Sequence, residues 1–453
     1  MKAYLSLICL FLVVNVLTAQ TFPVSKIMNN GPDDKRINFV LMGDGYQTAE
    51  MKKYKDDAQA LSNYFFTKSP FKEYRNFFNF HIIEVPSKES GADHPGNASD
   101  EGSNPPPIKN VDTYLGSTFD FAGIHRLLVP TSPNTINVLA SNFPDYDQAL
   151  VLVNSNIYGG SGGFLATAST DLSSSEVMIH EVGHSFANLG DEYWFNCEER
   201  PNRTAMNDPA SIKWKNWLVN SDIGIHNMEG NNCYRPHNDC EMRYLNREFC
   251  SVCKEAIVTQ IYRLISPIES SLPKPNIINF TNNPIEFTLN LVLPQPNTLK
   301  IDWNLDETLV SAGNALFTLN RNFLTKEKHT LTAVVTDTTF LSRTHLSTGK
   351  GLSFQRSWTI NNESTVSTIP IENFSYNVYP NPAYDELNIE VNASGKLSYS
   401  ISNATGQILK NANISEGGAE KSFQIDIKDL PKGWYQLNLK TPLYHKNVGF
   451  IKM

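Results

Sequence analysis

The sequence predicts an α/β (α+β) domain over residues 24–265, followed by two all-β sandwich domains over residues 270–362 and 374–453. In the first region, apolar strand patterns alternate with helical periodicity, which favours helices packed on a mixed sheet. The expected strands are 37–42, 77–85 and 149–154, and the expected helix between the first two is 49–66. After Pro267 the pattern changes to short alternating runs separated by turn residues, which is typical of antiparallel sandwiches.

The second region shows strand alternation of the kind found in immunoglobulin-type sandwiches. Ile285, Phe287, Leu289 and Leu291 alternate with polar residues, and similar runs follow at 299–303 and 329–335. No residue pattern in this region indicates catalysis. We expect it to serve in packing or substrate docking.

The N-terminus has the composition of a secretory signal peptide over residues 1–20. Lys2 precedes an apolar run from about Leu5 to Leu17, and small residues follow up to a predicted cleavage near Ala19 or Gln20. The run is too short to span a membrane comfortably, and no later stretch predicts a transmembrane segment. We therefore expect export from the cell, to a secreted or outer-membrane and cell-surface location.

The overall charge narrows the range of partners. The formal net charge is −8 and the isoelectric point is about 5.7. A mildly acidic chain is poorly suited to bind phosphate backbones or anionic membrane surfaces. We expect no nucleic-acid partner.

The most informative motif is His-Glu-x-x-His, formed by His180, Glu181 and His184. On an α-helix, residues four apart lie on one face about 6 Å along the axis, so both imidazoles can reach one Zn²⁺ ion. Glu181 adjoins the first histidine, where its carboxylate can take a proton from a zinc-activated water. The pattern predicts a zinc-dependent hydrolase with Glu181 as general base and acid.

Flanking residues predict where this helix begins and ends. Ser173 and Glu176 have the spacing of a capping box at the N-terminus. Gly190 is placed to end the helix in a left-handed conformation. Tyr158 to Phe164, just before the helix, is rich in glycine, and either a substrate-pairing strand or a flexible loop fits that composition.

The third metal ligand is expected among the acids after the second histidine. A catalytic zinc needs three protein ligands and one open position. Asp191 is the predicted ligand, because the preceding Gly190 gives the backbone freedom to turn its carboxylate toward the metal. Glu192 is the near alternative. Glu198 or Glu199 would serve if the ligand came from a following helix.

Several motifs in order resemble the IgA peptidase family of bacterial zinc metallopeptidases. The segment HEVGHSFANLGDEYW is similar to the family's active-site stretch. Further blocks that resemble the family lie at 37–46, 70–74, 78–80, 89–91, 152–154, 158–160 and 240–243. The resemblance covers about residues 24–265. It implies a zincin-like metallopeptidase domain that binds Zn²⁺ and cleaves protein or peptide substrates, with no requirement that immunoglobulin A be among them.

Met242 and Tyr244 lie in the family-like segment after Cys240. Met242 fits the methionine turn of zincins, a loop that underlies the metal site, although a lone methionine is also an ordinary core residue. In some zincins a tyrosine placed as Tyr244 ligates the metal or stabilises the developing oxyanion. We take Tyr244 as a candidate catalytic residue.

The cysteines predict covalent or metal cross-links after the zinc helix. Removal of the signal peptide leaves five, Cys197, Cys233, Cys240, Cys250 and Cys253. In an oxidising compartment this clustering favours one or two disulfides, with one thiol left over. The alternative is a structural metal site that uses the Cys-x-x-Cys pair at 250 and 253 with Cys233 or Cys240. Spacing leaves the connectivity open.

The last region resembles the C-terminal sorting domain of the type IX secretion system. The similarity rests on the Tyr379-Pro-Asn-Pro start, the Gly433-Trp434-Tyr435 turn into a strand, and the basic, apolar end. It implies that the tail engages the type IX machinery during export across the outer membrane. The resemblance also implies that the tail is afterwards removed or exchanged for a surface anchor.

Two other functions compete with a secreted zinc metalloendopeptidase. One is a non-catalytic surface binding protein on a zincin scaffold, which would require a broken catalytic set, yet Glu181 and both histidines are intact. The other is a zinc amidase acting on amide bonds in glycans or peptidoglycan. Substrate specificity depends on loops whose conformation the sequence does not predict. The sequence therefore distinguishes an endopeptidase from an amidase poorly.

Overall fold

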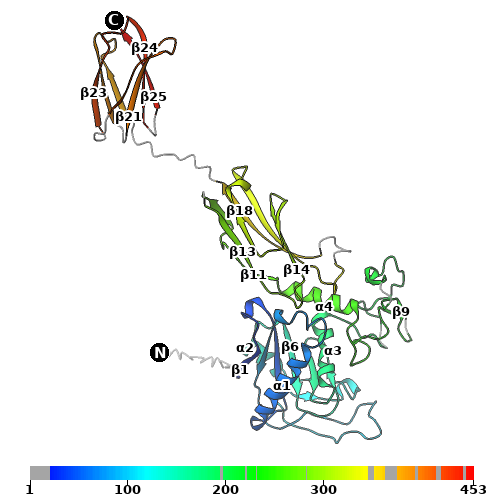
Figure 1. Ribbon diagram of the computed structural model, residues 1–453. Coiled ribbons are helices and arrows are strands. Elements are labelled where there is room, and N and C mark those ends of the chain that lie inside the picture. The colour runs from blue at the N-terminus through cyan, green and yellow to red at the C-terminus, as the bar shows by residue number, and fades with distance from the viewer. Residues whose placement is uncertain are drawn as a thin grey trace, which may run out of the picture. The chain divides into compact units, whose positions relative to one another are not determined.

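The chain divides into two compact units, Met1–Asn362 and Glu363–Met453, in a computed structural model (Figure 1). The structure describes residues 21–193, 197–219, 222–230, 232–281, 283–344, 351–362, 375–392, 396–414, 420–441 and 445–453. The signal peptide predicted at 1–20 lies outside these residues. Within them, no helix is both long and apolar enough to cross a membrane. The domain boundaries expected from the sequence stay a prediction.

A six-stranded mixed sheet forms the centre of the first unit, in the order β1-β3-β2-β6-β8-β7. Its strands are β1 (Val24–Met28), β2 (Ile37–Asp44), β3 (Phe78–Ile83), β6 (Gln148–Val153), β7 (Gly160–Ser161) and β8 (Ala166–Ser169). The four inner strands are parallel, and both edge strands run antiparallel to their neighbours. The three strands expected from the sequence are therefore β2, β3 and β6.

Helices cover both faces of this sheet (Figure 1). The helices are α1 (Met51–Phe65), α2 (Asn134–Asn142), α3 (Ser174–Ala187) and α4 (Ser251–Leu264). Phe39 and Leu41 of β2 pack in one apolar cluster with α1, α3 and α4, whereas Val40 and Met42 pack with α2. Burial on both faces explains why β2 reads as a continuous apolar run.

Short elements complete this part of the chain. Two-residue strands are β4 (Ser117–Thr118), β5 (Val129–Pro130), β9 (His226–Asn227) and β10 (Tyr234–Arg235). The 3₁₀ helices are Asp33–Lys35, Thr48–Glu50, Arg75–Phe77, Phe121–Gly123, Lys215–Trp217 and Arg321–Phe323, the last in the following sandwich. The described part of the segment between α3 and α4 is mostly irregular.

A β-sandwich follows α4 within the same unit. Its strands are β11 (Ile268–Leu272), β12 (Ile277–Phe280), β13 (Ile285–Leu291), β14 (Leu299–Leu305), β15 (Thr308–Ala312), β16 (Leu316–Leu319), β17 (Lys328–Asp337) and β18 (Leu352–Asn362). They form the sheets β11-β13-β16 and β12-β18-β17-β14-β15. Phe287, Trp303 and Trp358 fill the space between the sheets.

The second unit is also a two-sheet β structure. Its strands are β19 (Ser375–Tyr379), β20 (Glu386–Asn392), β21 (Leu397–Asn403), β22 (Ile408–Ile414), β23 (Glu420–Asp426), β24 (Gly433–Lys440) and β25 (His445–Lys452). The sheets are β19-β20-β23 and β22-β21-β24-β25. Leu387, Ile389 and Leu437 are fully buried between them, and the Gly433-Trp434-Tyr435 segment opens β24 as the sequence predicts.

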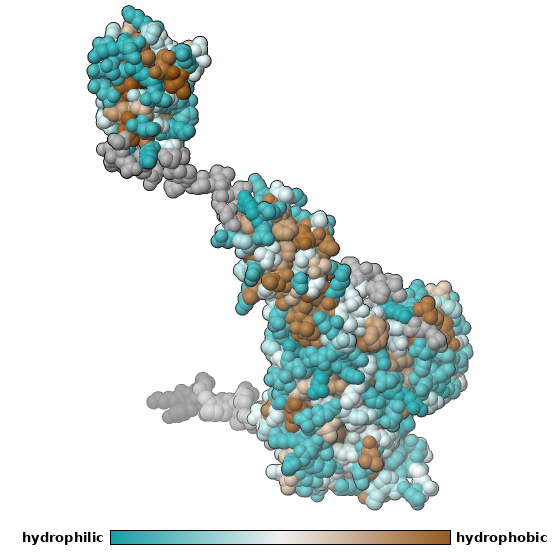
Figure 2. All heavy atoms as spheres, viewed as in Figure 1, coloured by the Kyte–Doolittle hydropathy of each residue, from teal (hydrophilic) through white to brown (hydrophobic). Residues whose placement is uncertain are grey.

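Hydrophobic side chains also reach the surface of the first unit's sandwich. On the face drawn in Figure 2, they are prominent over the sandwich, while the part that contains the mixed sheet is mainly hydrophilic. Ile277, Leu309 and Leu316 are among the exposed apolar residues of the sandwich strands.

Asp337, at the end of β17, joins the sandwich to the mixed-sheet region. Its carboxylate accepts hydrogen bonds of 2.6 Å from the hydroxyls of both Tyr74 and Tyr262, the latter on α4. All three residues are buried, so neither hydroxyl can exchange this acceptor for bulk water. This carboxylate is one of several links across the junction, beside the 2.6 Å ion pair between Arg36 and Glu269.

Asp337→Ala should destabilise the first unit by about 3 kcal/mol, because an unsatisfied buried hydroxyl costs roughly 1–3 kcal/mol and two would be left. A drop of several degrees in the thermal midpoint of the full-length protein would show this. Asp34→Ala is the matched control, since Asp34 is exposed and pairs only with exposed Lys35. Equal midpoints for the two variants would contradict this role for Asp337.

Candidate active site

Helix α3 carries the His-Glu-x-x-His motif, but its two ends differ from the sequence prediction. The Ser173 side chain makes no capping hydrogen bond. Glu176 is buried instead, where it pairs with Lys68 at 2.7 Å and accepts a hydrogen bond from Tyr64. The predicted capping box is therefore wrong, because burial against α1 and the loop that follows it competes for the Glu176 carboxylate.

The C-terminal end of α3 lies two residues earlier than predicted. Asn188, not Gly190, adopts the left-handed conformation, with φ of 54°. Asparagine tolerates this region better than most residues that carry a side chain. Gly190 instead donates its N–H to Asn202 Oδ1 at 2.7 Å and lies against Arg200 and Arg203, where a Cβ atom would be crowded.

Three potential metal ligands converge after this turn. Nε2 of His180 lies 3.2 Å from Nε2 of His184, and Asp191 Oδ1 lies 3.0 and 3.3 Å from these two nitrogens. His180 and His184 come from consecutive turns of α3, whereas Asp191 comes from the loop that turns back at Asn188. The structure thus brings together the three residues that the sequence predicts as ligands.

Backbone carbonyls fix the orientation of both imidazole rings. His180 Nδ1 donates to the carbonyl of Glu241 at 2.9 Å, and His184 Nδ1 donates to the carbonyl of Leu189 at 2.8 Å. Because a carbonyl can only accept, each Nδ1 carries a proton, so a ring that gives up its second proton presents its Nε2 lone pair to the common centre. This is the arrangement that metal-binding histidines require.

The charges of the group favour a cation at this centre. Burial lowers the pKa of His180, but the hydrogen bond to Asp191 and the charge of Glu181 outweigh burial and raise that pKa to about 9. Burial would raise the pKa of Asp191, yet the two imidazoles hold it well below its usual range. Asp191 therefore remains a carboxylate, with its charge directed at the two Nε2 atoms.

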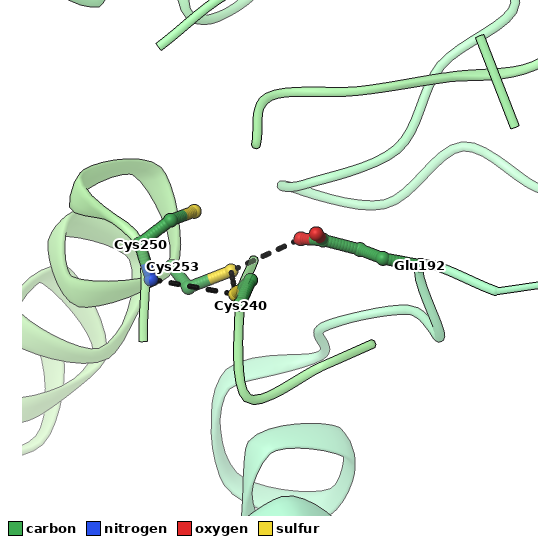
Figure 3. A group of neighbouring side chains, drawn as sticks. All are labelled: Glu192, Cys240, Cys250 and Cys253. Carbon is green, nitrogen blue, oxygen red and sulfur yellow. Dashed lines mark hydrogen bonds between the residues drawn. The ribbon is translucent and has the colours of Figure 1, made fainter. Parts of the chain in front are cut away.

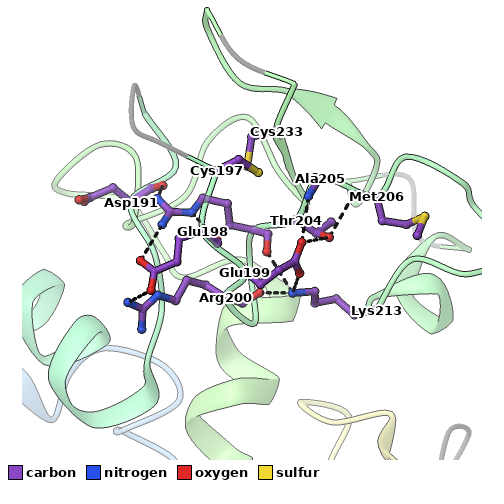
Figure 4. The surroundings of a disulfide bond; sticks show 11 residues. Asp191, Cys197, Glu198, Glu199, Arg200, Thr204, Ala205, Met206, Lys213 and Cys233 are labelled. Carbon is purple, nitrogen blue, oxygen red and sulfur yellow. Dashed lines mark hydrogen bonds and ion pairs between the residues drawn. A yellow bond between two sulfur atoms is a disulfide. The ribbon is translucent and has the colours of Figure 1, made fainter.

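The alternative acids do not reach this centre. Glu198 pairs with Arg200 at 2.7 Å, and Glu199 pairs with Lys213 at 2.6 Å (Figure 4). Glu192 is fully buried but turns away from the histidines, toward Cys253, whose Sγ lies 3.5 Å from Glu192 Oε1. Of the acids considered from the sequence, only Asp191 joins the histidine pair.

A cavity of about 320 Å³ opens beside His180 and Glu181. Burial raises the pKa of the Glu181 carboxyl. Tyr244 lines this cavity and is half exposed. Three further lining residues were not expected from the sequence: Arg126, Tyr158 and Tyr193. Arg126 lies in a loop with no recognisable pattern. Tyr158 opens the glycine-rich segment before the helix and Tyr193 directly follows the acidic pair, so the sequence offered a signal for both.

The glycine-rich segment before α3 crosses this cavity. A Cβ atom on Gly162 would lie 2.7 Å from Glu181 Oε2 and 2.9 Å from His184 Cβ, so only glycine fits there. Gly160, in edge strand β7, already has backbone hydrogen bonds to Arg126 and Leu128. A substrate strand would therefore have to pair beyond Gly160.

Met242 lies against α3 at Gly183, between the two histidines of the motif. A Cβ atom on Gly183 would be 2.7 Å from Met242 Sδ, and Met242 is fully buried. Its carbonyl accepts a 2.8 Å hydrogen bond from the N–H of Glu192. The methionine loop thus contacts both the helix and the loop that carries Asp191.

The cysteines form one disulfide in the structure. Cys197 and Cys233 form a disulfide bond, and the sequence predicted one or two such bonds (Figure 4). Cys240, Cys250 and Cys253 are free and buried. Cys250 is the N-cap residue of α4, and Cys253 lies in its first turn.

A separate group of titratable side chains lies in the loops before α2. His94 Nε2 is 3.0 Å from Glu101 Oε1, and His125 Nδ1 is 3.0 Å from Asp120 Oδ1. The two histidines and two carboxylates carry opposite charges when ionised, so they can satisfy one another as two pairs. No sequence motif indicated this group.

Comparison with known families agrees with both resemblances noted above. Residues 25–225 match the family described as IgA Peptidase M64. This part of the chain is thus similar to the peptidase domain of the M64 family. Residues 377–451 match the secretion system C-terminal sorting domain, which directs the protein to the cell surface or out of the cell. The M64 match supports a metallopeptidase, and the structure supplies candidate metal-binding groups.

Curated proteins and solved structures add little to the family match. None of the curated proteins matches the sequence. The glucan-locus protein SGBP-B of Bacteroides ovatus is 11% identical, over 39% of this chain and 42% of its own, with a TM-score of 0.15. The Parabacteroides merdae β-glucuronidase is 8% identical, over 46% and 29%, with a TM-score of 0.15. The chain thus spans less than half of either structure, and likenesses this weak carry no conclusion.

Gly162→Ala should lower peptide hydrolysis roughly 10- to 100-fold, because the added methyl group must displace Glu181 or His184 from its place. Cleavage of an unfolded protein substrate by the full-length protein measures this effect. Gly102→Ala is the control, since a Cβ atom there meets nothing within 4 Å. Full activity in Gly162→Ala would show that the segment does not confine these two side chains.

Proposed function

We propose that the protein is an exported zinc metalloendopeptidase with a zincin-like catalytic domain. One observation carries the proposal: His180 Nε2, His184 Nε2 and Asp191 Oδ1 lie 3.0–3.3 Å apart, beside the half-buried side chain of Glu181. The M64 match supports the peptidase part. The requirement for zinc and the roles of individual residues are further parts of the proposal.

The donor set fits Zn²⁺. Zinc–nitrogen and zinc–oxygen bonds of about 2.0–2.1 Å at tetrahedral angles place ligand atoms about 3.3 Å apart, close to the spacing here. Two imidazoles and one carboxylate are also a common catalytic zinc set, and three protein ligands leave one position open. Bound there, zinc would supply Lewis acidity toward a water molecule and the scissile carbonyl.

Glu181 is the proton carrier in this proposal. It accepts a proton from the attacking water and later delivers it to the leaving amine. Its raised pKa suits both steps, because a group that titrates nearer to neutral pH can accept and release the proton readily. In the same proposal, Tyr244, which lines this cavity, donates a hydrogen bond to the developing oxyanion.

Substrate class follows from the family and the route of export. Protein or peptide substrates fit the M64 domain, and the sorting domain implies that they are met outside the cell. The described cavity is open at Tyr244, which is 49% exposed, so an extended chain can enter from this side. This accessibility favours an endopeptidase over an enzyme limited to chain ends.

Glu181→Gln should retain bound zinc and the thermal midpoint but lose at least a hundredfold in peptide cleavage, since general-base catalysis contributes about 10²–10⁴-fold. Metal analysis and identification of new peptide termini in a mixed proteome measure both properties. Glu286→Gln, an exposed substitution on β13, is the control. Substantial turnover by Glu181→Gln would refute the assignment. Absence of zinc from the wild-type protein would favour a non-catalytic binding protein.

Deletion of residues 374–453 should trap the protein in the periplasm, because the sorting domain is the part that matches the secretion family. Fractionation of the native host and immunodetection measure the location. As a reciprocal control, the same residues fused to an unrelated periplasmic protein should carry it out of the cell. Normal release of the truncated chain would contradict the role of the tail.

A further inference from the structure

A second group of metal-ligand types lies next to the proposed catalytic centre. Glu192, Cys240, Cys250 and Cys253 each offer one ligand atom, and these four atoms all lie within 4.8 Å of one another (Figure 3). The four side chains come from three separate segments: the loop after α3, the methionine loop and the start of α4. All four residues are buried.

Disulfide bonding does not explain this group. The sulfur atoms of Cys240 and Cys253 are 3.7 Å apart, well beyond the bond length of about 2.05 Å in a disulfide. Three thiols also cannot all be paired with one another. The observed separation instead matches the edge of a tetrahedron built from zinc–sulfur bonds of about 2.3 Å, which is about 3.8 Å.

The polar atoms around the thiols are organised as a ligand shell. Glu192 is fully buried, and its Oε2 has no hydrogen-bond partner among the described residues. Its Oε1 accepts from Asn202 at 2.8 Å, which orients the carboxylate toward the sulfurs (Figure 3). The N–H of Cys250 donates to Cys240 Sγ at 3.3 Å, a contact that stabilises a thiolate.

We propose that Cys240, Cys250, Cys253 and Glu192 bind a structural Zn²⁺ ion, distinct from the catalytic one. Thiolates are soft ligands that favour zinc over calcium or magnesium, and four protein ligands close the site to water and substrate. On binding, three S–H protons leave to solvent, and three zinc–sulfur bonds and one zinc–oxygen bond form. Buried Arg235, which pairs with Glu229 at 2.8 Å, donates to the backbone carbonyl of Glu192 at 3.0 Å and so holds this residue in place.

This ion would position the catalytic residues through the backbone. Glu192 directly follows Asp191, and Cys240 directly precedes Glu241, whose carbonyl orients His180. A metal bound to Glu192 would therefore restrain the adjacent Asp191. A metal bound to Cys240 would restrain the adjacent Glu241, whose carbonyl orients His180. Cys250 and Cys253 join this assembly to α4, which packs in the main apolar cluster.

The test replaces zinc with Co²⁺ in the full-length protein and records its near-ultraviolet absorption. Cobalt bound by thiolates gives an intense sulfur-to-metal charge-transfer band, whereas the proposed catalytic ligands contain no sulfur. The band should appear in the wild type and persist in His180→Ala/His184→Ala, which removes two catalytic ligands. It should also persist in His125→Ala, which disrupts the separate histidine–carboxylate group.

The state of the thiols gives an independent readout that needs no variant. After denaturation without reductant, alkylation and peptide mapping should label Cys240, Cys250 and Cys253 together in protein recovered from the culture medium. Labelling of only one of the three would reveal a disulfide and overturn the proposal. A wild-type cobalt protein without the charge-transfer band would overturn it as well.

Glu192→Gln tests the fourth ligand with little change in shape. Loss of the carboxylate should lower the chelator concentration that removes the thiolate-bound metal at least tenfold, while the charge-transfer band stays present before chelation. Glu286→Gln should behave as the wild type. Unchanged chelator resistance in Glu192→Gln would exclude Glu192 as a ligand. The band and alkylation pattern are independent of peptidase activity, so failure here is distinguishable from failure of the proposed function.

Discussion

The left-handed turn at Asn188 is the constraint on which the candidate site depends. It ends α3 four residues after the second histidine and reverses the chain, so that the carbonyl of Leu189 meets His184 Nδ1 and Asp191 meets both Nε2 atoms. One backbone conformation thus orients one imidazole and supplies the third potential ligand. A helix that continued to Gly190 would carry the Asp191 carboxylate away from the histidines, since each further residue advances 1.5 Å along the axis.

The methionine loop is the second support of this arrangement. Glu241 accepts from His180 Nδ1, and Met242 accepts from the N–H of Glu192 while its sulfur lies against Gly183. The loop therefore contacts the helix and the returning chain at once, through backbone groups that any residue could supply. Only the close approach at Gly183 and the shape of Met242 constrain the sequence. This explains why the functional signal of the loop is faint when the sequence is considered alone.

The strong sequence signals were those that arise from periodicity or from adjacent functional groups. Strands β2, β3 and β6 and helix α1 follow the apolar pattern because they are buried in a regular way. The ends of α3 did not follow local rules, because Glu176 is drawn into a buried pair with Lys68 and because Asn188 rather than Gly190 takes the left-handed turn. The cysteine pairing depends on how the irregular segment folds, and spacing carries no information about that. Arg126 reaches the cavity from a distant loop, and no sequence pattern indicates that approach.

The adjacent side chains of Asp191 and Glu192 point in opposite directions, and both groups of potential ligands depend on this difference. Both were reasonable ligands by sequence, and the structure uses them in opposite directions: Asp191 toward the two histidines, Glu192 toward the three cysteines. Because successive side chains in an extended segment point to opposite sides, one dipeptide can serve two centres only if its backbone is fixed. The hydrogen bond from the N–H of Glu192 to Met242 supplies that restraint. A shift of one residue in this loop would place either Glu192 and Tyr193, or Gly190 and Asp191, in the positions that face the histidines and the cysteines, so both groups depend on the same register.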